Sequence, residues 1–379
     1  MISSEGGIFL LTVATIYLSF FLFREIFPEK FEKHGLSFDG LAIILRTKKL
    51  NHFIEYVGKK YSKIWKIYAS LGIPLGIILA IYGIYVMHLN VILLLKGAPG
   101  AAPTQPLIPG VTVGLDALPY FALAILITFV PHELSHGFVL TAEDLPIESS
   151  GILLFLVIPG GFVEPVEEVF EKAEAVKKLR VLVAGSLTNF LEALVILLAS
   201  TLVLVPGGVM IEQTIPNMPA EGILEPGDIL VAINNSQIRN LADLTKVLSK
   251  FKPGEKVVLT IIRDKERLNI TLRLGQHPQN KSRGIIGAYF TVYYPSDPHG
   301  VLYKIFWWSY VVTMSVAVIN IMPIYPLDGG KSLKTLLEKI WHDKKADLVT
   351  YGISLYLAAL ILVNIILSLA KWGPRIWYP

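Results

Sequence analysis

The chain has 379 residues, of which 53% are hydrophobic and 17% are charged, whereas soluble domains are about 45–50% apolar and roughly 25% charged. This composition excludes an ordinary soluble protein and predicts an integral membrane protein. The formal net charge of +4 does not indicate a nucleic-acid partner, because the basic residues collect beside apolar segments as loop charges do in membrane proteins. The chain has no cysteine, so a metal ion would have to be held by imidazole and carboxylate groups.

Apolar stretches predict six transmembrane helices, because about 20 predominantly apolar residues are needed to cross a hydrocarbon core of about 30 Å. The first stretch is expected to be a retained span, since no positively charged segment precedes it and no small-residue cleavage site follows it. In chain order the six expected spans are 7–23, 68–95, 117–140, 181–205, 301–322 and 346–370.

Loop charges predict the orientation of these spans. The segment 24–66 holds ten Lys and Arg residues and the segment 97–116 holds none, which places 24–66 in the cytoplasm by the positive-inside rule. The alternation of spans then places 141–180 and 323–345 in the cytoplasm and 206–300 on the outer side, with both termini outside. The sequence does not indicate a role for 24–66.

Residues 206–300 differ in pattern from the rest of the chain. Short β-branched runs at 257–262 and 268–272 are separated by turn residues, and 240–251 is a polar helical stretch, which together predict a soluble α+β insert. The segment 219–235 resembles the strand-and-turn signature of PDZ domains. Since PDZ domains add an extended peptide to a sheet edge, the resemblance implies a module that binds a peptide or a substrate ectodomain outside the membrane.

The stretch 151–165 is apolar, but it is too short and too interrupted by Gly and Pro to span a membrane as a helix. It predicts a re-entrant β-hairpin. Non-helical backbone survives at membrane depth only where protein or a water-filled cavity covers it. A hairpin here would therefore lie beside an internal polar cavity.

The third expected span contains the sequence His-Glu-Leu-Ser-His, with His132 and His136 at positions i and i+4. This spacing puts both imidazoles on one helical face, within reach of one ion. In an H-E-x-x-H arrangement the glutamate, here Glu133, acts as a general base and not as a ligand. Ionisable groups cost at least ~2.5–3.5 kcal/mol at the centre of a membrane helix, so these three residues require either a function or, in the plainer interpretation, a polar cluster that joins helices.

A catalytic zinc site uses three protein ligands and one open position, and Asp328 is the best candidate for the third ligand. It follows Pro323 and Pro326 and precedes a Gly pair, which must end the fifth expected span at the same membrane side as His136. Two alternatives remain open at this point. Asp328 would otherwise cap a helix that starts near Ser332, or be a solvated loop charge.

The H-E-x-x-H motif in a membrane span, the run Asn-x-x-Pro-x-x-Pro-Leu-Asp-Gly at 320–329 and a PDZ-like module between them resemble the site-2 protease family of intramembrane zinc metalloproteases. The similarity covers about 117–345. It implies one Zn²⁺ per chain held by His132, His136 and Asp328, with Glu133 as the catalytic base. It also implies transmembrane protein substrates, cut within the lipid bilayer.

Two further elements match this family. The sequence Gly-Ser-Leu-Thr-Asn ending at Asn189 matches a G-x-x-x-N element of the middle core helix. The match implies that Asn189 orients the substrate backbone or steadies the oxyanion, although an Asn in a membrane helix is as often a helix–helix hydrogen-bond donor. Gly160 and Gly161 match the membrane-embedded β element, which implies pairing with an unwound substrate.

The sequence therefore predicts an α-helical polytopic membrane protein with an embedded β-hairpin and an inserted PDZ-like domain. We expect a multi-pass cell-membrane protease whose active site faces the cytoplasm. The alternative is a non-enzymatic zinc-binding scaffold or transporter-like protein, although a carrier is expected to show an internal repeat that this sequence lacks. The expected divisions are 1–116 (two spans and a basic loop), 117–205 (zinc-binding helix, β element and middle core helix), 206–300 (PDZ-like domain), 301–345 (third core helix with the Asp motif) and 346–379 (last span).

Overall fold

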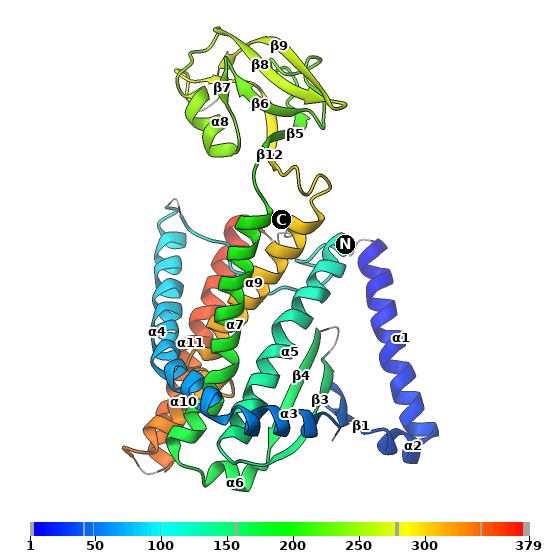
Figure 1. Ribbon diagram of the computed structural model, residues 1–379, viewed down its shortest axis with the longest axis vertical. Helices are drawn as coiled ribbons and strands as arrows, with labels where there is room; N and C mark the ends of the chain where they lie inside the picture. The colour runs from blue at the N-terminus through cyan, green and yellow to red at the C-terminus, as the bar shows by residue number, and fades with distance from the viewer. Residues whose placement is uncertain are drawn as a thin grey trace. The chain divides into compact units, whose positions relative to one another are not determined.

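The structure is a computed structural model that describes residues 4–40, 42–47, 49–98, 100–155, 158–276, 280–341 and 343–373. It divides into two compact units, and the ribbon in Figure 1 follows the chain through both. One unit joins residues 1–197 to 304–379, and the other consists of residues 198–303.

Long helices form the first unit and coincide with the expected spans. Among the described residues, five helical segments are long and apolar enough to cross a membrane, and they contain α4, α5, α7, α9 and α11. Helix α1 occupies the position of the first expected span, and its crossing of the membrane stays a prediction. The bounds are α1 (Ser4–Ile26), α4 (Ser62–Leu95), α5 (Leu118–Ala142, preceded by a 3₁₀ turn at Leu115–Ala117), α7 (Ala175–Val203), α9 (Val301–Ile321) and α11 (Asp343–Trp372).

Glycines on one face of α4 allow the core helices to approach it closely. A Cβ atom at Gly72 would lie 2.8 Å from the Leu187 side chain of α7, and one at Gly83 would lie 2.8 Å from Val318 of α9. Helix packing in membranes depends on such small residues, because lipid tails remove the hydrophobic driving force between helices. Helix α4 therefore contacts two helices of the core.

The segment 24–66, which the sequence left without a role, folds into α2 (Pro28–Lys33), β1 (Leu36–Asp39), β2 (Ala42–Thr47) and α3 (Lys49–Lys60). Its strands extend the expected hairpin. Strand β3 (Ile147–Phe155) pairs with β2 on one side and with β4 (Ile158–Pro165) on the other, and β1 pairs with β2, which gives an antiparallel sheet of order β1-β2-β3-β4. The hairpin is therefore half of a four-stranded sheet, with β4 at one edge.

Helix α9 ends at Ile321, and the chain then turns through Pro323 and Pro326 into α10 (Asp328–Leu337). Proline lacks the backbone donor that a helix interior needs, which explains the break. The N-cap of α10 is Leu327 and its first residue is Asp328. The alternative in which Asp328 caps a helix starting near Ser332 is therefore wrong, because the helix begins four residues earlier than that alternative requires. A short helix, α6 (Glu167–Glu171), connects β4 to α7.

The second unit is a small β-sheet domain with one helix. Its main sheet has the order β12-β5-β6-β8-β9, and β7 pairs with β6. Alternating apolar residues of the strands form a buried core that includes Ile211, Leu230 and Leu259, each at 0% exposure. The elements are β5 (Gly208–Thr214), β6 (Ile229–Ile233), β7 (Ser236–Gln237), α8 (Leu241–Leu248), β8 (Lys256–Arg263), β9 (Glu266–Arg273), β10 (Gly275–Gln276), β11 (Gly284–Ile285) and β12 (Ala288–Tyr293).

Candidate active site

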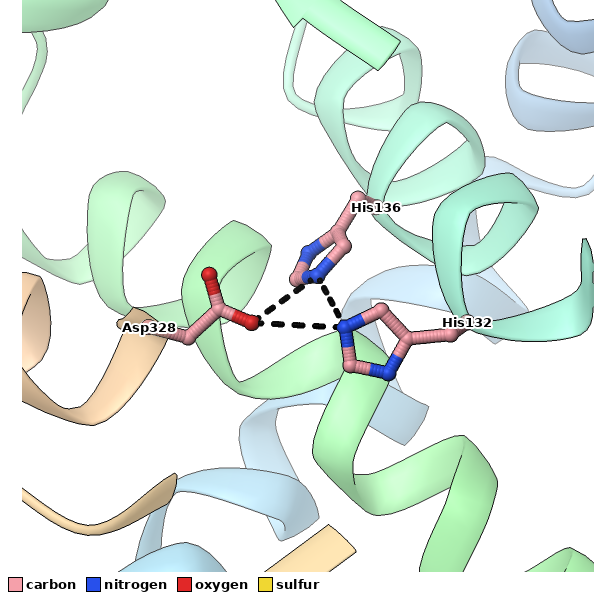
Figure 2. Close-up of side chains that lie close together, drawn as sticks. All are labelled: His132, His136 and Asp328. Atoms are coloured by element: carbon pink, nitrogen blue, oxygen red, sulfur yellow. Dashed lines mark hydrogen bonds and ion pairs between the residues drawn. The ribbon is translucent and has the colours of Figure 1, made fainter. Parts of the chain in front are cut away.

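Helix α5 and the first turn of α10 bring two imidazoles and one carboxylate together. The Nε2 atoms of His132 and His136 lie 3.2 Å apart. The Oδ2 atom of Asp328 lies 3.5 Å from Nε2 of His132 and 3.1 Å from Nε2 of His136, as the dashed lines in Figure 2 show. The sequence proposed these three residues as one ligand set, and the fold places their donor atoms around one point.

The spacing of the three donors fits a zinc ion. Zn²⁺ binds His nitrogen and carboxylate oxygen at about 2.0–2.2 Å in tetrahedral geometry, which places neighbouring ligand atoms about 3.3–3.5 Å apart. The three separations here run from 3.1 to 3.5 Å. The side chains of His132, His136 and Asp328 are 4%, 13% and 17% exposed, so an ion held there would be shielded from bulk water while one coordination position could open into a cavity.

A hydrogen bond at the rear of each imidazole orients it. Nδ1 of His136 lies 2.7 Å from the carbonyl oxygen of Val181 and donates to it, which leaves Nε2 unprotonated. Nδ1 of His132 lies 2.9 Å from the side-chain amide of Asn189. The Asn189 Oδ1 atom is buried and has no other partner in the described part of the chain. The amide orientation that directs Oδ1 at Nδ1–H satisfies both groups and frees Nε2 of His132 for a metal.

Gly185 of α7 makes room for both rings. A Cβ atom at this position would lie 2.4 Å from Nε2 of His136 and 2.5 Å from Nε2 of His132. Such distances are far inside van der Waals contact, so a side chain of any kind would displace the imidazoles. From the sequence, Gly185 is only the first residue of the element that ends at Asn189. The structure shows that its lack of a side chain is needed at the ligands themselves.

Glu133 lies between the ligand set and the edge strand β4. The backbone of Val163 on β4 lies near its carboxylate. Gly161 faces it, and a Cβ atom on Gly161 would lie 3.1 Å from Cγ of Glu133. Gly160 instead faces Leu153 of β3, and a Cβ atom on Gly160 would lie 3.2 Å from Cδ1 of that leucine. Of the two glycines proposed from the sequence, Gly161 is therefore the one next to Glu133.

One cavity of about 990 Å³ contains the ligand set and Glu133. Its walls come from α5, β4, α9 and α10, and residues such as Phe162 and Asn320 line it. Asn189 is fully buried at 0% exposure and is not among the lining residues. In this structure the Asn189 amide contacts Nδ1 of His132, and the contact with substrate that the family resemblance implied stays a prediction.

Asn320 is a site residue to which the sequence reasoning gave no role. Its Nδ2 atom donates to Oδ2 of Asp328 at 2.6 Å and lies 3.1 Å from Nε2 of His132. The available signal was its position as the first residue of the run at 320–329, in the last turn of an apolar span and eight residues before Asp328. That signal could not be interpreted from the sequence, because the turn through Pro323 and Pro326 determines which groups α9 and α10 bring together.

A bundle of membrane-type helices that encloses two imidazoles, a carboxylate and a neighbouring glutamate defines a membrane metallohydrolase. The comparison with known proteins narrows this class, because residues 120–364 match the sequence pattern of Peptidase family M50. The chain belongs to that family. It is a metalloendopeptidase of the site-2 protease type, and the alternative of a non-enzymatic scaffold or transporter is not favoured.

Relatives of known sequence extend over much of the chain. An uncharacterised protein of Methanocaldococcus jannaschii is 30% identical over 307 residues, which is 77% of each chain. A membrane-bound transcription factor site-2 protease homolog of Arabidopsis thaliana is 24% identical over 59% of this chain and 43% of its own. The zinc metalloprotease RasP of Shouchella clausii is 24% identical over 53% of this chain and 62% of its own.

One matching solved structure overlaps a small part of the chain. The crystal structure of the PDZ domain of an SdrC-like protein from Listeria monocytogenes covers 22% of this chain and 88% of its own, with 16% identity and a TM-score of 0.21. The interpretation of residues 206–300 as a PDZ-like module therefore continues to rest on the sequence signature at 219–235.

Proposed function

We propose that this protease cleaves transmembrane segments of other membrane proteins, with one zinc ion held by His132, His136 and Asp328 and with Glu133 as the catalytic base. One observation carries the proposal. The three donor atoms lie within 4.8 Å of one another and share a 990 Å³ cavity with Glu133, inside a unit built from helices that are long and apolar enough to cross a membrane.

The reaction requires a base, a proton carrier and a group that faces the developing oxyanion. A zinc ion at this site would polarise the scissile carbonyl and make water more acidic. Glu133, which adjoins the ligand set and lines the cavity, would accept the proton of the attacking water and return it to the leaving amine. Asn320, an amide donor in the cavity wall beside Asp328, would stabilise the negative charge on the carbonyl oxygen.

Strand β4 would present the substrate to these groups. The carbonyls of a transmembrane helix are bonded within the helix, so a scissile bond becomes accessible only in an unwound segment. Strand β4 is the terminal strand of the order β1-β2-β3-β4, and its Gly161 faces Glu133. An unwound segment that adds to this edge would gain backbone hydrogen bonds and would lie next to the base.

The distribution of Lys and Arg in the loops supports an active site that faces the cytoplasm. With the basic segment 24–66 in the cytoplasm, the end of α5 that carries His136 and the start of α10 also face the cytoplasm. The domain at 206–300 would then lie outside the cell membrane. There it would bind a peptide or a substrate ectodomain and so control which membrane proteins reach the cavity, as regulated intramembrane proteolysis requires.

The test is Glu133→Gln in the full chain, reconstituted with a single-span test substrate that carries Asn-Gly-Pro in the cytoplasmic half of its span. Removing a positioned general base costs about 10²–10⁴-fold in rate, so we expect cleavage to fall by at least two orders of magnitude while bound zinc, measured by elemental analysis, stays at one per chain. The control is Glu168→Gln, which neutralises an exposed glutamate on α6 and should cleave normally. Unchanged cleavage by Glu133→Gln would refute the proposal.

A further inference from the structure

A second, apolar groove lies behind the catalytic helix. Its volume is about 430 Å³. Helix α5 contributes Pro131, Leu134, Ser135 and Phe138 to its wall. These four residues lie on a different face of α5 from His132, Glu133 and His136. The four positions span about 10 Å along the helix at ~1.5 Å per residue. Helix α4 closes the other side with Ile64, Trp65 and Tyr68.

A hydrogen bond between α4 and α7 closes one end of the groove. The Tyr68 hydroxyl lies 2.7 Å from Oγ1 of Thr188 on α7. At the other end, Ile64 is 63% exposed, and the Trp65 ring stacks on Phe138 with 4.9 Å between centroids. The Trp65 Nε1 atom is buried without a hydrogen-bond partner among the described residues. The groove thus has an apolar interior, and one of its lining residues, Trp65, has an unused donor.

Helix α3 and the first turn of α4 place positive charge at this open end. Figure 1 shows α3 running across the axes of α4 and α5, the orientation of a helix that lies along a membrane surface. The Phe53 ring contacts Phe138, with 5.9 Å between centroids, so α3 adjoins the groove. Between positions 49 and 66 the chain has one acidic residue, Glu55, and five lysines: Lys49, Lys59, Lys60, Lys63 and Lys66.

Aromatic side chains surround one of these lysines. The Nζ atom of Lys60 lies 5.0 Å from the ring centre of Tyr56 and 5.5 Å from that of Tyr61, and it donates to the Tyr56 hydroxyl at 2.7 Å. This hydrogen bond raises the pKa of the Lys60 ammonium. Tyr56 and Phe53 are 60% and 51% exposed, a combination of aromatic and cationic side chains that is typical of the membrane interface.

Helix α3, together with Lys63 in the first turn of α4, is called here the α3 rim. Helix α3 packs closely against α5. On the opposite side of α3 from Tyr56, Ile54 is fully buried at 0% exposure. A Cβ atom at Gly58 would lie 1.9 Å from Oγ1 of Thr141 and 2.6 Å from the carbonyl oxygen of Phe138. Since α3 approaches α5 this closely, the backbone that carries Lys59 and Lys60 is fixed relative to the α5 side of the groove.

We propose that the groove and the α3 rim together bind one anionic phospholipid, with an acyl chain along Leu134 and Phe138 and the headgroup at Lys60 and Lys63. The charge of the rim selects an anion, because lysines near a membrane surface each attract anionic lipid. A helix with side chains is about 10–12 Å wide, which is too large for a groove of 430 Å³, whereas a single chain fits. The inference does not depend on peptidase activity, so it can fail or succeed independently of the proposed reaction.

The test measures quenching of Trp65 fluorescence by brominated lipids. The full chain is reconstituted in phosphatidylcholine vesicles that contain a small fraction of brominated phosphatidylglycerol or of brominated phosphatidylcholine, and the Trp65 signal is obtained by subtracting the signal of Trp65→Phe. We expect half-maximal quenching at a phosphatidylglycerol fraction on the order of tenfold below that of phosphatidylcholine, given the attraction of two lysines for anionic lipid.

Two double variants distinguish lipid binding at this site from a general attraction of anionic lipid to the positive surface of the protein. Lys60→Gln with Lys63→Gln should abolish the preference for phosphatidylglycerol. Lys344→Gln with Lys345→Gln removes two exposed lysines at the start of α11 and should retain it. Four results would overturn the proposal, and three of them are equal quenching by both lipids, equal loss in both double variants, and displacement of the quencher by a synthetic transmembrane peptide regardless of lipid charge. Free glycerol phosphate should not displace it, since it lacks the acyl chain, and displacement would also contradict a lipid site.

Discussion

At Gly185, helix α7 passes directly against the two imidazoles of the candidate metal centre. A Cβ atom there would lie 2.4–2.5 Å from ring atoms of both histidines, and packed interiors do not absorb overlaps of that size without side-chain shifts. The methyl group of an alanine would push the Nε2 atoms out of the spacing that suits a zinc ion. The smallest possible side chain is therefore a structural condition for the site.

We predict that Gly185→Ala lowers zinc affinity and activity together while the fold is retained. Loss of ligand orientation commonly costs about 10–100-fold in metal affinity, and zinc titration followed by elemental analysis would measure it. The matched control is Gly352→Ala on α11, where an added Cβ meets nothing within 4 Å. That change should leave zinc binding intact and stabilise the helix by roughly 0.5–1 kcal/mol. Wild-type zinc affinity in Gly185→Ala would show that the rings have room to move.

Asn189 has two possible roles, which are to position the His132 imidazole or to contact the substrate. Its amide contacts Nδ1 of His132 and it is absent from the cavity wall, so we assign it to positioning that imidazole. We predict that Asn189→Leu lowers zinc affinity by about 10–100-fold and leaves KM unchanged once zinc is saturating. Titration of zinc and of a test substrate would provide both values. A raised KM at normal zinc occupancy would instead support the substrate contact that the family resemblance implies.

At the scale of secondary-structure elements, β4 presents alternate residues to opposite faces, and its two glycines differ accordingly. Gly161 faces Cγ of Glu133 at 3.1 Å, whereas Gly160 faces the flexible end of Leu153. A valine at 161 would push Glu133 from its position, and a valine at 160 would displace only an aliphatic side chain.

We predict that Gly161→Val reduces kcat by at least tenfold with zinc content unchanged, because a misplaced base loses part of its contribution of about 10²–10⁴-fold. Gly160→Val should retain most of the activity. The measurement is cleavage of the test substrate under saturating zinc, with bound zinc determined on the same samples. Equal rates for the two variants would argue against a role for this edge strand beside the base.

The sequence predicted these elements to different extents. The H-E-x-x-H spacing identifies its helical face because the helical repeat alone brings His132 and His136 together. The hairpin at 151–165 was predicted from its Gly and Pro residues, but its partner strands at 36–47 were not, because pairing between segments a hundred residues apart leaves no local pattern. Asn320 was quoted as the first residue of the run at 320–329, but its contact with Asp328 was not predicted, since the proline turn before α10 determines that contact.

At the scale of the whole molecule, the domain at 198–303 separates the two segments that supply the ligand set. His132 and His136 precede it and Asp328 follows it, yet all three belong to the other unit. The domain also has a hydrophobic core of its own, formed by residues such as Val209, Ile233 and Leu272, and an ion pair at 2.6 Å between the partly exposed Arg263 and the buried Asp228. It therefore has the features of a module that folds independently.

We predict that replacing residues 206–300 with a flexible Gly/Ser linker of about 12 residues leaves zinc binding at wild-type affinity, since no donor is removed. A short test substrate without an outer domain should be cleaved at a similar rate, because the base and the edge strand remain. If the domain controls access, substrates with a large outer domain should be cleaved faster by the deletion variant than by the full chain. Comparing the two substrate types measures this effect, and loss of zinc from the deletion variant would instead show that the inserted domain is needed to bring α5 and α10 together.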